Sequence, residues 1–172
     1  MILLLISIYI CLALIIYYDI RFRALPVIIL ILLNGLIITQ GILNNHIMDY
    51  LYYSVLNFGF VVFIVSFLFA YVYLLKKEKK IFKKFIGWGD VFILLIMCIA
   101  FSPVNYMIFF TLASFFTLIT WSTIRFIKKR LSPQIPFAGF ISFFYFAELL
   151  ISGLFSFNNY NDHLLLDFIS TC

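Results

Sequence analysis

The chain consists of long apolar runs separated by short polar segments. Because the hydrocarbon core of a bilayer is about 30 Å thick, a helix needs roughly 20 apolar residues to cross it. Run length and intervening charges therefore predict six spans. The fourth is short, because Ser102-Pro103 follows it, and it either ends early or continues through the proline. The six spans cover about residues 1–18, 26–43, 51–75, 90–101, 105–126 and 135–155.

Composition supports this interpretation. Of 172 residues, 66% are hydrophobic, 21% are aromatic and only 11% are charged. A soluble domain of this size could not bury so much apolar surface. We therefore expect an all-α polytopic membrane protein with about six transmembrane helices. Residues 1–157 would form a six-helix core and residues 158–172 a short polar and apolar tail. The first run lacks a basic segment and a small-residue cleavage site, so we interpret it as a span and not a signal peptide.

The cations of the chain fall into three loops. Short loops rich in Lys and Arg remain in the cytoplasm, so these loops are expected on the cytoplasmic side and both termini outside. The run of lysines is also expected to attract anionic lipids of the inner leaflet. Two arginines follow the first span, six lysines follow the third, and four cations end or follow the fifth: Arg21 and Arg23, residues 76–84, and Arg125, Lys128, Lys129 and Arg130.

Two acids lie at the predicted cytoplasmic face. Asp19 ends the first apolar run, and Asp90 ends the glycine-rich turn Gly87-Trp88-Gly89-Asp90. Ionisable residues at membrane depth are costly, and they usually face the interior of the bundle. Glycines in the turn let the backbone fold tightly and let another segment approach closely. Since both acids share one depth, we expect them to meet.

A pair of close carboxyl groups suits peptide hydrolysis. Two such groups cannot easily both ionise, so they share a proton and titrate as a unit. The ionised acid would activate water, and the protonated acid would polarise the scissile carbonyl. No metal or other cofactor is expected. The alternative is structural: Asp90 would only cap the fourth span, and Asp19 would pair with a cation as an interfacial anchor.

Three segments together resemble the type IV prepilin peptidases, which are intramembrane aspartic proteases. They are Asp19 with Leu25-Pro26, the turn Gly87-Trp88-Gly89-Asp90, and residues 135–140, Ile-Pro-Phe-Ala-Gly-Phe. The resemblance implies removal of leader peptides from type IV prepilins or pseudopilins at the cytoplasmic face of a bacterial or archaeal inner membrane. It also implies that Asp19 and Asp90 are catalytic, that Gly87 and Gly89 shape their turn, and that Pro26, Pro136, Phe137 and Gly139 are candidates for substrate contact.

The chain departs from the family pattern at several positions. Phe92 stands where members commonly carry Lys, Val27 stands where they carry Asn or Asp, and Gly139-Phe140 replaces Gly-Pro. The three cysteines form no CxxC pair. The larger members carry a domain with paired CxxC motifs and methylate the mature pilin, so methyl transfer is not expected here.

Other functions fit some of the same features. Another GxGD protease, of the presenilin or signal-peptide-peptidase kind, would place a Tyr-Asp pair in a helix, and Tyr18-Asp19 resembles that pair. A non-catalytic scaffold or small transporter could use the acids to bind cations or anchor loops. Glu148 lies too deep in the sixth span to join the pair. No nucleic-acid partner is expected, and the oligomeric state and the particular prepilin stay open.

Position along the helices suggests different roles for the two acids. Asp90 opens a span, where the positive end of the helix dipole favours a carboxylate, whereas Asp19 closes one. Asp90 is therefore expected to activate the water and Asp19 to carry the shared proton. The assignment requires Arg21 and Arg23 to turn away from Asp19, toward lipid headgroups.

The segregation of Lys and Arg generates a testable topology. In a variant without the native cysteines, single cysteines at Asn45 and Asn159 should react with an impermeant reagent added outside the cell. Cysteines at Lys79 and Lys129 should react only after the cells are opened. The reverse pattern would place the two acids on the outer face.

Overall fold

The computed structural model describes residues 2–44, 47–76, 87–127 and 135–155, with some side chains inside helices left out. Those segments are all-α, as predicted, and four of their helices are long and apolar enough to cross a membrane. The helices α2 and α5 are also apolar but shorter. The cationic segments 77–86 and 128–134 and the tail lie outside the described residues. The helices are α1 (Ile2–Phe22), α2 (Val27–Asn44), α3 (Ile47–Lys76), α5 (Trp88–Met97), α6 (Pro103–Ile127) and α7 (Phe137–Phe155).

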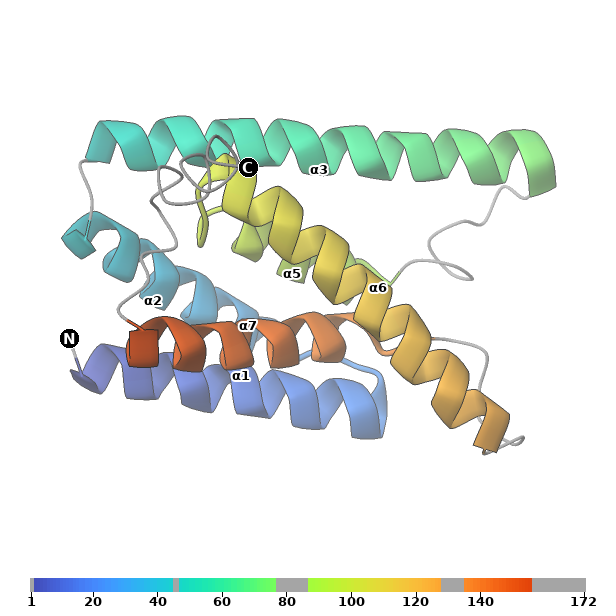
Figure 1. Ribbon diagram of the computed structural model, residues 1–172, viewed down its shortest axis with the longest axis horizontal. Helices are drawn as coiled ribbons and strands as arrows, with labels where there is room; N and C mark the ends of the chain where they lie inside the picture. The colour runs from blue at the N-terminus through green and yellow to red at the C-terminus, as the bar shows by residue number, and fades with distance from the viewer. Residues whose placement is uncertain (1, 45–46, 77–86, 128–134, 156–172) are drawn as a thin grey trace.

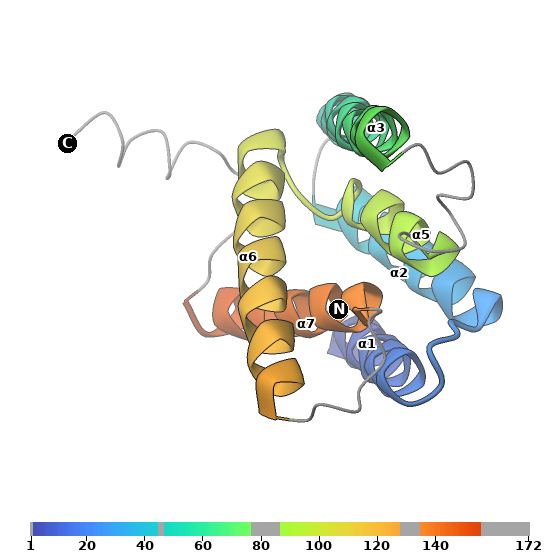
Figure 2. The same ribbon diagram turned by 90° about the vertical axis from the view of Figure 1, so that its right-hand side faces the viewer.

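Successive helices alternate in direction (Figure 1). The helix α1 packs between α2 and α7, and α6 crosses diagonally against α7 and α3. Viewed along the bundle, α2 and α5 lie between α3 and the pair formed by α1 and α7 (Figure 2). The end of α1 and the starts of α2, α5 and α7 therefore lie at one end of the protein, which we call the site end (Figure 1).

A buried stripe on α1 holds the centre of the bundle together. Ile8, Leu12 and Ile15 recur at the helical spacing of three and four residues, and none of them exposes any surface. They belong to one core with Ile37 of α2 and Ile141 of α7. Many large apolar side chains on the other faces are exposed, as expected where helices face lipid and not water. The bundle thus has an apolar exterior around a packed interior.

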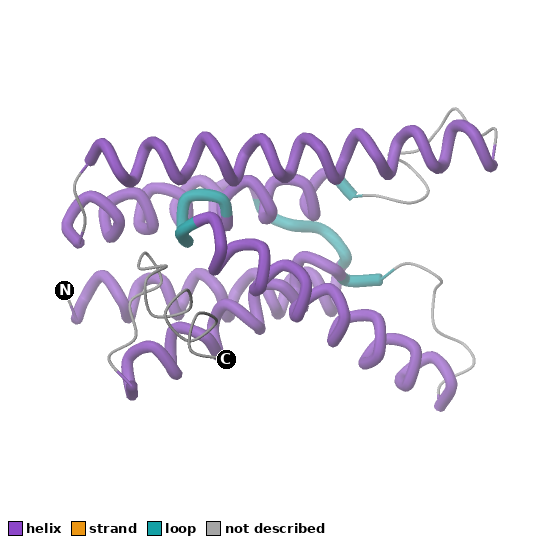
Figure 3. The backbone as a smooth tube through the Cα atoms, turned by 45° about the horizontal axis from the view of Figure 1, so that its top comes forward, coloured by secondary structure: helices purple, strands orange, loops and turns teal. Residues whose placement is uncertain are grey.

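The helix α5 ends early. It has ten residues and stops at Met97, so it spans roughly 15 Å, about half of the hydrocarbon core. A turn over residues 98–102 connects it to α6, which begins at Pro103; proline suits the first helical position because its missing N–H has no partner there. The turn lies within the length of the neighbouring helices, not beyond their ends (Figure 3). The early end is therefore the correct one of the two expected alternatives.

A polar side chain from α3 forms hydrogen bonds with free carbonyls of this internal turn. The carboxamide of Asn57, which is 1% exposed, donates from Nδ2 to the carbonyls of Cys98 at 2.9 Å and Phe101 at 2.8 Å. The hydroxyl of Tyr106 donates to the carbonyl of Leu94 at 3.2 Å. Free carbonyls at membrane depth have no water to bind and are costly when unpaired. Asn57 and Tyr106 therefore allow a helix to end inside the bundle.

We expect Asn57→Leu, which keeps the number and branching of the side-chain heavy atoms, to destabilise the protein by about 1–3 kcal/mol, because two buried carbonyls lose their donors. Thermal unfolding in detergent micelles measures the effect. Thr39→Ala is the matched control, since it also removes a side-chain bond to a carbonyl, but at an exposed position on α2. Equal stability of the two variants would contradict the capping role of Asn57.

Candidate active site

The two acids come from different helices at the site end. Asp19 lies in the last turn of α1, because this helix continues to Phe22 and not only to the expected residue 18. It is buried, with 7% of its surface exposed. Asp90 is the third residue of α5 and is partly buried. Both acids are therefore withdrawn from solvent near a helix end.

The first turn of α7 binds both carboxyl groups. The amide of Gly139 donates to Oδ2 of Asp19 at 2.6 Å, and the preceding amide, that of Ala138, donates to Oδ1 of Asp90 at 3.0 Å. Amides in the first turn of a helix have no acceptor within the helix and carry a partial positive charge. The two carboxyls are also close enough for a negative charge on Asp19 to repel one on Asp90. The two acids thus lie close together, as their common predicted face suggested.

Asp90 also closes its own turn. Its Oδ2 accepts the amide of Gly87 at 3.1 Å, and Gly87 is the residue that precedes the first turn of α5. Asp90 is therefore the third helical residue and reaches back to that amide, the acidic half of a capping box. The structural alternative holds in part, because Asp90 does stabilise the start of α5. Its other oxygen binds α7, so capping does not account for the whole arrangement.

At three glycines of the site, a neighbouring side chain lies close to the backbone. A Cβ at Gly139 would lie 3.0 Å from Oδ2 of Asp19, and one at Gly87 would lie 3.1 Å from Oδ2 of Asp90. A Cβ at Gly89 would lie 2.6 Å from Cδ1 of Leu25. No glycine in the described part of the chain has a positive φ. Their role here is therefore to leave space, and they do not supply a left-handed turn.

The remaining candidates, Pro26, Pro136 and Phe137, lie at the starts of α2 and α7, at the site end. Leu25 packs against Gly89 and thereby joins the segment after α1 to the turn before α5. Pro26 precedes α2, and its carbonyl accepts the amide of Ile29 at 3.1 Å. Pro136 is buried and Phe137 partly buried, directly before the two amides that bind the acids. The geometry thus gives Gly139 a position against Asp19, and it places Pro136 and Phe137 at the start of α7.

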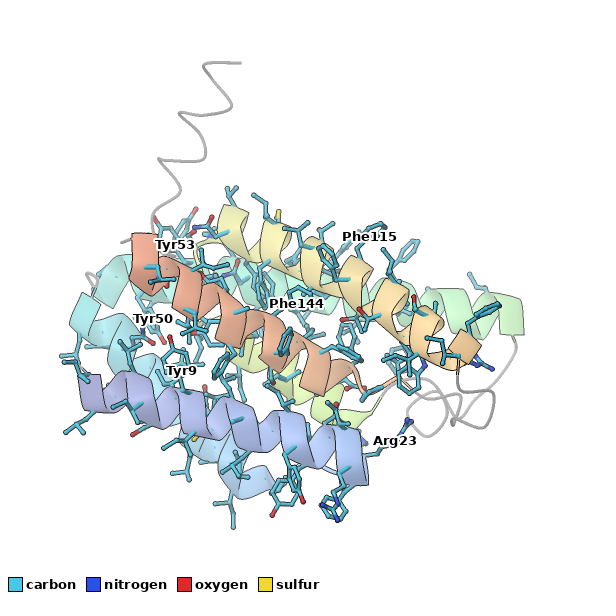
Figure 4. The ribbon with its side chains drawn as sticks, turned by 60° about the horizontal axis from the view of Figure 1, so that its bottom comes forward. Tyr9, Arg23, Tyr50, Tyr53, Phe115 and Phe144 are labelled. Atoms are coloured by element: carbon cyan, nitrogen blue, oxygen red, sulfur yellow. The ribbon has the colours of Figure 1, made fainter. Side chains whose placement is uncertain are left out.

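The two arginines after the first acid have different surroundings. Arg21 is exposed and donates to the hydroxyl of Tyr17 at 2.6 Å, on the outer face of α1. Arg23 is partly buried, and its Cζ lies 5.3 Å from the ring centroid of Trp121 on α6. The positive charge of Arg23 attracts the carboxylate of Asp19. The expectation that both arginines turn toward headgroups is therefore wrong for Arg23, which lies beyond the end of α1 on the side of α6 and α7 (Figure 4).

Arg23 also has an unusual backbone. Its φ is 53°, in the left-handed region, and its amide donates to the carbonyl of Asp19 at 3.1 Å. This bond closes the end of α1 in the manner usually provided by glycine. A side chain in this conformation costs roughly 1–2 kcal/mol.

Phe92, Val27 and Glu148, which the sequence singled out, lie away from the acid pair. Phe92 and Val27, the departures from the family pattern, are exposed at 49% and 63%, so neither fills the space between the acids. Glu148 follows Gly139 by nine residues, roughly 14 Å along α7, and its carboxyl lies near Tyr9 of α1. Figure 4 shows Tyr9 on the N-terminal half of α1, well away from Arg23 at the other end of that helix. Glu148 is therefore remote from the acids, as predicted.

Sequence reasoning missed three contributors: the amide of Ala138, the guanidinium of Arg23 and the ring of Trp121. Pro136 signals a helix start, and from it the free amides of α7 could have been inferred. Nothing in the sequence pairs Arg23 with Trp121.

No protein-family model, curated protein or solved structure matches the chain. Within the described ranges, no group of three or more His, Cys, Asp and Glu could hold a metal ion. The chemistry of the site follows from its own groups. In the described part of the chain these groups are two carboxyls from separate helices, the amides that bind them, and the nearby cation Arg23. Such a site can transfer protons and activate water.

The space left by Gly139 can be tested with two alanine substitutions on α7. Alanine favours a helix over glycine by up to about 1 kcal/mol, so Gly153→Ala, with nothing within 4 Å of its Cβ, should be neutral or stabilising. Gly139→Ala should be less stable than Gly153→Ala, because its Cβ displaces Asp19. Thermal unfolding in micelles compares the two, and a gain of stability in both would mean that the space beside Asp19 is not required.

Proposed function

We propose that the chain is an intramembrane aspartic endopeptidase that removes the leader peptides of type IV prepilins or pseudopilins. Asp19 and Asp90 are its catalytic acids. One observation carries the proposal: consecutive amides at the start of α7 hold two carboxyl groups that come from different helices. A cap or an anchor requires one acid, whereas this arrangement brings two together.

The chemistry follows from the proximity of like charges. With one proton between them, one carboxyl is ionised and the other is neutral at the working pH. The ionised group takes a proton from water as the water oxygen bonds to the scissile carbonyl carbon. The neutral group donates its proton to the carbonyl oxygen. When the C–N bond breaks, the acid that took the proton from water passes it to the leaving amine. The other acid takes back a proton from a hydroxyl of the tetrahedral intermediate as the carboxyl product forms, so both carboxyls return to their starting state.

The position of the pair suits a substrate that is cut at a membrane boundary. Asp19 lies in the last turn of α1 and Asp90 in the first turn of α5, so in a membrane crossed by these helices both acids would lie toward one boundary. A prepilin presents a short basic leader, a glycine and then a long apolar helix. Its scissile bond would lie where that helix enters the membrane. This match favours a prepilin over a substrate that is cut within its transmembrane helix.

The cellular setting is part of the proposal. Several apolar helices are compatible with a multi-pass membrane protein. The positive-inside rule would place the site end in the cytoplasm, on the side of the three cationic loops. A bacterial or archaeal cytoplasmic membrane is the setting in which prepilins carry their leaders on that side. The lysine-rich loop would then lie beside anionic lipids.

The central test replaces each acid by its neutral isostere. Asp19→Asn and Asp90→Asn should each lower leader removal by at least about 100-fold, because the pair loses its shared proton. Cleavage of a co-expressed prepilin, followed by the size of the pilin, measures the effect. Both variants should still insert and accumulate.

Asp49→Asn is the matched control, because Asp49 lies in the first turn of α3, at the end of the bundle opposite to the site end. It should cleave at the normal rate. Near-normal cleavage by either Asp19→Asn or Asp90→Asn would exclude the two-acid mechanism. Cleavage lost in all three variants would point to a general folding defect.

A further inference from the structure

The chain keeps an arginine at a backbone position that suits glycine. Arg23 adopts a left-handed φ of 53° while its amide closes the end of α1. Glycine adopts this conformation without steric cost and is the residue usually found there. Strained backbone at a site points to a role for the side chain that offsets the strain. The side chain of Arg23 therefore requires an explanation beyond helix termination.

Trp121 holds the guanidinium in place. The Cζ of Arg23 lies 5.3 Å from the centroid of the indole, within the range of a cation–π interaction, for which Trp is the strongest partner. Trp121 is 8% exposed, and among the described residues its buried Nε1 has no hydrogen-bond partner. Its ring face, and not its N–H, is thus the part that is used. The contact also joins α6 to the end of α1.

The positive charge of the guanidinium that Trp121 holds attracts the carboxylate of Asp19. Among the described residues, the other groups that interact with the Asp19 carboxyl are Asp90 of α5 and the amide of Gly139 on α7. The packed helix α2 carries no charged residue, and α7 carries only the remote Glu148. Among the described residues near the pair, Arg23 therefore supplies the one full positive charge that acts on a carboxyl.

We propose that Arg23 is a positioning residue of the acid pair: held by Trp121, its guanidinium stabilises the negative charge on Asp19. The proposal rests on the proposed function insofar as the pair is catalytic. The amide of Gly139 also favours the ionised form of Asp19, but amides bind Asp90 in the same way, whereas Arg23 acts on Asp19 and not on Asp90. Arg23 thus opposes the assignment from helix ends, which gave the charge to Asp90.

The pH dependence of cleavage tests this role. In Arg23→Gln one limb of the profile should move to higher pH by about one unit, because without the cation Asp19 holds its proton more tightly. Movement of the acidic limb would mean that Asp19 carries the charge of the active pair, and movement of the basic limb would mean that Asp90 carries it. Both results support the stabilising role of Arg23. A profile that coincides with that of Arg21→Gln, the matched control, would overturn it.

Three further variants separate charge from structure. Arg23→Gly relieves the strained backbone and should therefore unfold no earlier than the wild type, yet it should show the same pH shift. Arg23→Lys keeps the charge but loses the planar group that stacks on the indole, so its shift should be smaller. Trp121→Leu should shift the profile in the same direction as Arg23→Gln. A pH profile of Arg23→Gly that matches the wild type would show that Arg23 only ends the helix.

A second readout does not need cleavage. In protein labelled with ¹³C at the Asp carboxyls and held in nanodiscs, the signal that is absent from Asp19→Asn identifies Asp19. Its titration midpoint should rise by about one pH unit in Arg23→Gln and stay unchanged in Arg21→Gln. A shifted midpoint in a protein that cleaves no prepilin would retain the role of Arg23 and refute the proposed function. An unshifted midpoint would refute the role of Arg23 whether or not the protein cleaves.

Discussion

The arrangement of the site depends on the first turn of α7. Two like-charged groups would repel each other in a low-dielectric interior, and their approach requires donors that offset this repulsion. Consecutive amides at a helix N-terminus provide such donors without any side chain. They fix the spacing of Asp19 and Asp90 more firmly than flexible side chains would. The sequence around these amides is consequently constrained by space: a Cβ at Gly139 would lie 3.0 Å from Oδ2 of Asp19, so the carboxyl would have to shift to admit it.

Much of the fold could be predicted because membrane helices have a simple signal. Apolar run length gave the number of helices and most of their limits, and the cations gave a common face for the acids. The length of α5 was the weakest prediction, since the apolar run continues past Met97 without a polar interruption until Ser102. The donor that pairs the free carbonyls after α5 comes from a different helix, α3. Asn57 lies 41 residues before Cys98, and a local pattern does not contain that partnership.

The site was predictable to a similar degree. The acids and glycines belong to short motifs, so they could be named from the sequence. The sequence also indicated that another segment approaches Gly89, but only the structure identifies that segment as Leu25. The orientation of Arg23 was not predictable. Interfacial arginines usually extend toward headgroups, and Arg21, two residues earlier, is indeed exposed. The left-handed backbone of Arg23 and the indole of Trp121, 98 residues away, redirect its side chain, and both are consequences of tertiary structure.

The short α5 connects the stability of the bundle to the geometry of the acids. One end of this helix is fixed by Asp90, which binds Gly87 and α7, and the other end by Asn57, which binds the turn from α3. A ten-residue helix has little stability of its own, so its position depends on these attachments. Loss of the Asn57 bonds would free the far end of α5, and a shift of that end would be passed along a rigid helix to Asp90. Since displacement of a catalytic group by about 1 Å can cost 100-fold in rate, a residue deep in the bundle can influence the acid pair without touching it.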